Sequence, residues 1–73
     1  MNHQENHLFT EKILRVIAKE RNETVKRLKR RIFLDQDQEV MSRFWELVKA
    51  ELPNHRGYEL SYCPGCKALS IDE

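Results

Sequence analysis

Two cysteines that flank a Pro-Gly pair, Cys63 and Cys66, are the residues of this chain best suited to chemistry. Two thiolates on one tight turn can converge on a single tetrahedral ion, and zinc binds such sulfur ligands at about 2.3 Å. The chain has no second Cys-x-x-Cys pair, so histidine would have to complete the site. The sequence therefore predicts half of a zinc site at this turn.

The predicted third ligand is His55, eight residues before Cys63. Eight extended residues reach more than about 20 Å, so the segment between them would have to fold back. His3 and His7 are spaced i, i+4 and could share one face of a helix, but they belong to a polar N-terminus. We therefore assign the metal site to Cys63, Cys66 and His55.

Two other interpretations of the cysteine pair stay open. The cysteines can be reduced structural thiols, which need no cofactor, or they can form a redox pair. Thioredoxin-like motifs occur where a strand leads into a helix, and that context is missing here. The predicted cofactor is accordingly one zinc ion or none.

Both cysteines belong to a predicted β-hairpin over residues 54–73. Tyr58, Leu60 and Tyr62 alternate with polar residues, which is typical of a strand with one covered face. Pro-Gly favours a type II turn, whose twist suits a two-stranded ribbon less well than primed turns do. A metal ion could hold such a turn closed. The hairpin would also have two unpaired edges, and an unpaired edge can accept a partner's strand.

A helical body is predicted before the hairpin, over residues 9–53. Apolar residues recur there at intervals of three and four in three stretches. These stretches predict helices at about 9–20, 23–33 and 36–51. Asn22 and Asp35 are the predicted N-caps of the second and third helices. Pro53 ends the third helix, because proline disfavours helical geometry at the residue before it.

The predicted fold class is α+β: about three short helices, then a hairpin with a Cys-Pro-Gly-Cys turn, in one compact domain. Residues 1–8 are predicted to be a flexible N-terminus. A 73-residue domain has a thin core and often depends on a metal ion, an oligomer or a partner. The sequence shows neither a signal peptide nor an apolar run of about 20 residues, so we expect a cytoplasmic protein with reduced thiols.

Charge is distributed unevenly, although the net charge is only +1. Seven basic and two acidic residues lie between Lys19 and Arg31, whereas two basic and five acidic residues lie between Asp35 and Glu51. Such asymmetry indicates a partner with a charged surface. The predicted partner-binding residues are the basic ones of the second helix and two tyrosines of the first strand: Lys26, Arg27, Lys29, Arg30, Arg31, Tyr58 and Tyr62.

Catalytic motifs are missing from the sequence. It contains no Gly-rich phosphate loop, no nucleophile elbow and no paired carboxylates in an apolar setting. We therefore expect a protein that acts by binding and is not an enzyme. One alternative is a nucleic-acid-binding module, dimeric and stabilised by zinc through Cys63 and Cys66.

In length, in its helical body with the basic segment 26–31 and in its terminal hairpin 58–71, the chain resembles the small regulators that lytic phages make to bind the host RNA polymerase. The resemblance rests on no specific motif. It implies a non-enzymatic regulator in the host cytoplasm that binds bacterial RNA polymerase, inhibits initiation and promotes antitermination. A second likeness, to zinc-containing anti-sigma proteins, fails at position 59, where Glu59 replaces the histidine of their His-x-x-x-Cys-x-x-Cys motif.

Overall fold

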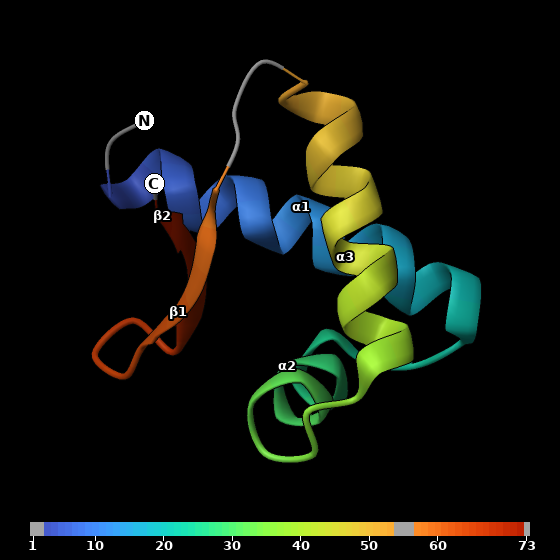
Figure 1. Cartoon of the computed structure of the whole chain (residues 1–73). Coiled ribbons are helices and arrows are strands. Elements are labelled where there is room, and N and C mark those ends of the chain that lie inside the picture. The colour runs from blue at the N-terminus through green and yellow to red at the C-terminus, as the bar shows by residue number, and fades with distance from the viewer. Residues whose placement is uncertain (1–2, 54–56, 73) are drawn as a thin grey trace.

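The computed structural model describes residues 3–53 and 57–72. Three helices precede a two-stranded antiparallel hairpin, which confirms the predicted α+β class (Figure 1). The elements are α1 (His3–Arg21), α2 (Val25–Phe33), α3 (Gln38–Glu51), β1 (Glu59–Cys63) and β2 (Ala68–Asp72). In the described part of the chain, no helix combines the length and the apolar character needed to cross a membrane.

The first helix begins at His3, so the prediction that it begins near Phe9 is wrong, and residues 3–8 are helical rather than a loose terminus. The buried face of these added turns is polar. Asn6 in these turns and Thr10 in the turn that follows are buried, and both bond to the backbone of β2 instead of packing in the apolar core. Apolar spacing therefore gives no sign of this part of α1.

Both predicted N-caps are also wrong. Asn22 has a φ of 56° and ends α1, because this left-handed residue lets the Glu23 N–H donate to the Ala18 carbonyl at 2.9 Å. Thr24 caps α2, and its side chain accepts from the Arg27 N–H at 3.1 Å. The N-cap of α2 therefore lies two residues after the predicted one, and the N-cap of α3 is displaced by the same amount.

Asp37, and not Asp35, is the N-cap of α3. Its carboxylate accepts from the Glu39 N–H at 3.0 Å and from the Val40 N–H at 3.3 Å. Gln36 has a φ of 49°, and this left-handed residue turns the chain so that Asp37 meets the first free N–H groups.

The hairpin is buried on one strand and open on the other. Cα partners run from Glu59 opposite Asp72 to Cys63 opposite Ala68. The inner strand β2 lies beside α1 and is buried from Ala68 to Ile71, whereas β1 lies on the outside (Figure 1). α1 thus holds the hairpin through β2.

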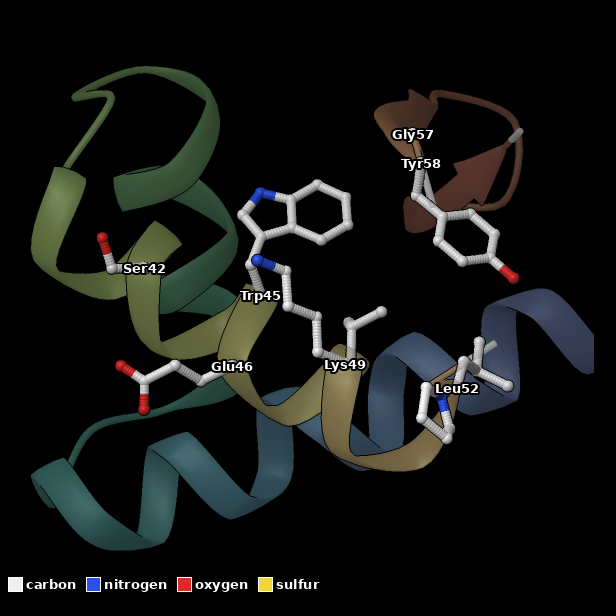
Figure 2. Close-up of a pocket in the computed structure, with 9 residues that line it drawn as sticks. Ser42, Trp45, Glu46, Lys49, Leu52, Gly57 and Tyr58 are labelled. Carbon is white, nitrogen blue, oxygen red and sulfur yellow. The ribbon is translucent and has the colours of Figure 1, made fainter. Parts of the chain in front are cut away.

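The core fills the space between the helices and β2. Its largest fully buried apolar side chains are Phe44, Leu14, Ile17, Leu28, Leu69, Val40 and Val48. Trp45 packs edge-to-face against Phe44 with ring centroids 5.5 Å apart. It is only half-buried, because with Leu52 and Tyr58 it lines an open groove of about 870 Å³ (Figure 2).

Candidate metal centre

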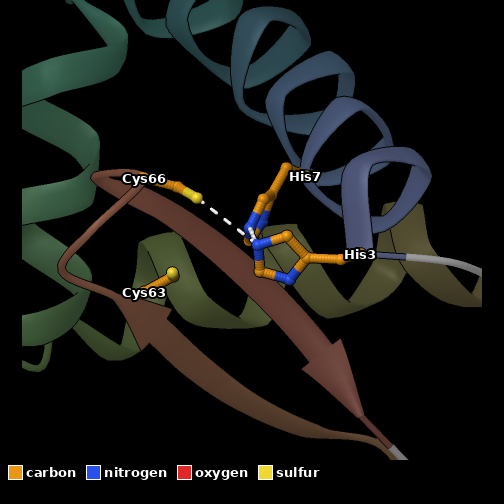
Figure 3. Close-up of side chains that lie close together, drawn as sticks. All are labelled: His3, His7, Cys63 and Cys66. Carbon is orange, nitrogen blue, oxygen red and sulfur yellow. Dashed lines mark hydrogen bonds between the residues drawn. The ribbon is translucent and has the colours of Figure 1, made fainter.

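Four side chains from the two ends of the chain converge at one place. His3 and His7 come from the first turns of α1, Cys63 ends β1, and Cys66 lies in the hairpin turn (Figure 3). One ligand atom of each residue lies within 4.8 Å of the other three. Because residues four apart share a helix face, both imidazoles point toward the turn. The arrangement can hold a metal ion.

The distances between ligand atoms approach those of a tetrahedral site. His3 Nε2 lies 3.0 Å from His7 Nε2 and 3.4 Å from Cys66 Sγ. Around a tetrahedral zinc ion with bonds of about 2.0–2.3 Å, neighbouring ligand atoms would lie about 3.3–3.8 Å apart. These two distances need adjustments of at most a few tenths of an ångström, and because no pair of ligand atoms is more than 4.8 Å apart, no pair needs more than about 1 Å to surround such an ion.

The hairpin fixes the orientation of the His7 imidazole through its Nδ1 atom. Its Nδ1 lies 3.2 Å from the Leu69 carbonyl oxygen and 3.1 Å from Ser70 Oγ. Because the carbonyl can only accept, this contact assigns the proton to Nδ1 and leaves the lone pair of Nε2 facing the other ligands. A metal-binding histidine is normally held in this way, with its second nitrogen donating to a carbonyl or carboxylate.

The two thiols have different proton affinities. The backbone N–H of Cys66, the Cys66 thiol and the backbone N–H of Gly65 donate to Cys63 Sγ and lower its pKa, against a smaller opposing effect of burial. The pKa of Cys66 is raised, because its thiol donates to Cys63, because it is partly desolvated and because the Cys63 charge is close. Cys63 is therefore the first thiolate, and a divalent cation would favour the second.

The cluster contains the two predicted cysteines together with His3 and His7, which are not among the predicted ligands. His55 lies outside the described residues, and the four ligands form a complete set without it. The i, i+4 spacing of His3 and His7 was the available signal. This spacing alone does not predict a metal site, because nothing local to residues 3–8 indicates that they contact a hairpin about 60 residues later in the sequence.

The predicted basic surface is divided by ion pairs. Lys29 Nζ lies 3.2 Å from a Glu11 carboxylate oxygen and donates to the Lys67 carbonyl at 3.1 Å. Arg31 contacts Glu23 at 2.8 Å and Asp37 at 3.9 Å. Both side chains are half-buried and neutralised, so these two residues stabilise the fold and do not extend the exposed charge.

Lys26, Arg27 and Arg30 remain as the charge that α2 exposes, and we call them the α2 cation surface. None of the three forms an ion pair or a side-chain hydrogen bond within residues 3–53 and 57–72. Together with Thr24, Arg31 and Asp35 they line a shallow hollow of about 500 Å³. Three of the five predicted cations are thus available to a partner.

The two predicted tyrosines have different surroundings. Tyr58 lines the open groove with Trp45, whereas Tyr62 packs against Phe33 of α2 with the rings tilted by 53° and their centroids 5.2 Å apart. Tyr62 keeps 43% of its surface exposed. Neither tyrosine lines the hollow formed by the α2 cation surface.

Comparison of the chain with protein-family models, with curated proteins and with solved structures gives no match.

Proposed function

We propose that this protein is a small non-enzymatic binding module that is stabilised by one zinc ion held by His3, His7, Cys63 and Cys66. The observation that carries the proposal is the convergence of the four ligand atoms within 4.8 Å. Two imidazoles and two thiolates are a donor set that suits zinc better than magnesium or calcium, which prefer oxygen.

Such a zinc ion would be structural. Four protein ligands fill a tetrahedral shell, whereas catalytic zinc sites keep one position for water or substrate. The ion would join residue 3 to residue 66 and so fix both chain ends around β2. A domain of 73 residues gains much from one such link, since its apolar core is small.

Binding would use the α2 cation surface. Its three unpaired cations stand on a helix whose apolar side chains Leu28 and Ile32 are anchored in the core. Exposed, pre-positioned charge of this kind accelerates and orients association with a polyanionic surface. The partner we propose to test first is bacterial RNA polymerase, on the basis of the resemblance to phage regulators, with inhibition of initiation and antitermination as the activities to assay.

Nucleic acid is the second candidate partner, and the same three unpaired cations favour it. Phosphate binding loses affinity linearly on a double-logarithmic salt plot, because each contact releases counterions. Binding to a protein surface that also buries apolar groups depends less on salt. A salt titration with each partner therefore distinguishes the two.

The zinc proposal is tested by metal analysis of protein purified without added metal or chelator. We expect one zinc ion per chain, and we expect C63S, C66S, H3N and H7N each to lose it. The matched control is H55N, which should keep full occupancy. Occupancy near zero in the wild-type protein would contradict the proposal, and loss of zinc in H55N would show that the ligand set is wrong.

The partner proposal is tested by reversing charge on α2. The double variant R27E/R30E should lose most of its affinity at low salt. R15E/K19E is the matched control, because it makes the same change of charge at exposed, unpaired positions of α1. Equal losses in both variants would indicate a general charge effect and would remove the α2 cation surface as a site.

A further inference from the structure

The two outer edges of the hairpin differ in whether their free backbone groups have hydrogen-bond partners. On β2, Asn6 donates to the Ile71 carbonyl at 2.7 Å and accepts from the Ile71 N–H at 2.9 Å. The Leu69 carbonyl accepts from Thr10 Oγ1 at 2.6 Å. Side chains of α1 therefore cover the free backbone groups of β2, and this edge is closed to other strands.

These contacts also show which backbone groups β1 presents outward. Since Leu69 and Ile71 direct their peptide groups to α1, they form the non-hydrogen-bonded pairs of the ladder with Tyr62 and Leu60. In such a pair, both residues point their N–H and C=O groups away from the partner strand. The outer edge of β1 therefore presents the backbone groups of Leu60 and Tyr62.

No described segment covers this edge. No backbone hydrogen bond links Leu60 or Tyr62 to a turn, loop or helix of the described residues, and β1 packs chiefly on β2. Of the usual protections of an edge strand, proline and lysine do not occur in Glu59–Cys63, and the one charged side chain, Glu59, is at its end. An open edge beside the exposed ring of Tyr62 is suited to pairing with another strand.

We propose that the strand that binds this edge is β1 of a second copy of the chain, antiparallel and related by a two-fold axis at Ser61. Leu60 then lies opposite the partner's Tyr62, and Tyr62 lies opposite the partner's Leu60. Both pairs are hydrogen-bonded pairs, so all four outward N–H groups across the two strands find a carbonyl. Two hairpins become one four-stranded sheet.

The register of this pairing is favourable on both faces of the sheet. Leu60 and Tyr62 form aromatic–aliphatic cross-strand pairs on the face that Leu69 and Ile71 share. On the other face Glu59 lies opposite the partner's Cys63, so the carboxylates of the two copies do not oppose each other. A symmetric, self-complementary strand of this kind needs no partner of different sequence.

The assembly also stops at two copies. Its outer edges are the β2 strands, and α1 covers both of them through Asn6 and Thr10. No further strand can add, so the pairing closes instead of growing into a fibre. All four candidate metal ligands come from one chain, so the dimer does not depend on a shared ion.

The test uses the full chain with its native metal content, studied by sedimentation over a concentration series. We expect a reversible dimer. S61K and S61E place like charges opposite each other at the axis, and each should raise the dimer dissociation constant by about tenfold or more. An equimolar mixture of S61K and S61E should restore dimers, because opposite charges then meet.

S42K on α3 is the matched control, since Ser42 is also exposed, and it should dimerise like the wild-type protein. Circular dichroism of S61K checks that the fold persists. Hydrogen exchange gives a second measurement: the Leu60 and Tyr62 amides should be protected in the dimer and exchange quickly on dilution. A wild-type monomer at every concentration, a dimer insensitive to S61K, or unprotected Leu60 and Tyr62 amides in the dimer would each overturn the proposal.

Discussion

The fold acts in opposite ways on the candidate metal centre and on the basic residues of α2: it brings the ligands of the first together and gives the residues of the second different surroundings. The metal centre unites His3 and His7 with Cys63 and Cys66, which are about 60 residues away in the sequence. The five basic residues of α2, by contrast, lie within the six residues 26–31 of the sequence, and the fold gives them different surroundings. Lys29 and Arg31 turn to carboxylates of other elements, while Lys26, Arg27 and Arg30 stay in solvent.

The comparison shows that local density of a residue type is a poor guide to a site. Ligands far apart become a site when two elements pack, because the packing supplies the proximity. Neighbouring charges cease to be one site when some of them have partners within reach. The contact α1 makes with β2 is therefore the structural feature on which the metal centre depends, and ion pairing decides the extent of the α2 cation surface.

Removal of the metal should have the largest effect. An ion that binds only the folded state stabilises it by about 4 kcal/mol when free zinc is a thousandfold above the dissociation constant. Chelator should therefore shift the urea unfolding midpoint strongly in the wild-type protein and not in C63S. Identical midpoints with and without chelator would show that α1 and the hairpin hold together without an ion.

Asn6→Ala tests the α1–β2 contact directly. It removes two buried hydrogen bonds and leaves the Ile71 peptide groups without partners, which should cost about 2–4 kcal/mol in unfolding free energy. The same variant should bind zinc more weakly, because the first turns of α1 carry His3 and His7. The control is Gln4→Ala at an exposed site of the same helix. Equal stability of the two variants would mean that Asn6 does not hold the hairpin.

Arg31→Ala and Arg30→Ala compare two neighbouring cations. Arg31→Ala leaves the carboxylate of Glu23, only 14% exposed, without its 2.8 Å partner and should cost about 1–2 kcal/mol. Arg30→Ala should change stability by less than about 0.5 kcal/mol and weaken partner binding instead. Chemical denaturation and a binding assay give both quantities. A reversed order of the two effects would place the α2 cation surface on the wrong residues.

The smallest effect should come from the exposed pair between Glu20 and Arg43. Arg43 donates to the Glu20 carboxylate at 2.6 and 3.0 Å, and this hydrogen bonding lowers the Glu20 pKa. A lowered folded-state pKa gives stability that is present above the ordinary carboxyl range and lost as the pH falls through the lowered value. The stability difference between wild type and Glu20→Gln should therefore be small at neutral pH and vanish in acid. A difference in stability between the two proteins that persists in acid would show that the contribution of Glu20 comes from side-chain packing and not from its charge.

Much of the fold could be predicted from local pattern. The three helices and the hairpin follow from apolar spacing and alternation, and Cys63 and Cys66 follow from the Cys-Pro-Gly-Cys turn. The N-caps were missed by two residues each, because Asn22 and Gln36 take left-handed conformations that shift the helix starts. Nothing in the residue types alone separates a capping residue from one that ends the preceding helix.

The sequence by itself determined the elements, the two thiols on a turn and the total charge, because each depends on residues close together in the chain. Only the tertiary structure decided that α1 begins at His3, that two histidines meet the thiols and that two cations of α2 are neutralised. The physical reason is common to all three. They depend on polar partners outside the element that carries the residue, and hydrophobic periodicity carries no information about which polar groups of different elements will meet.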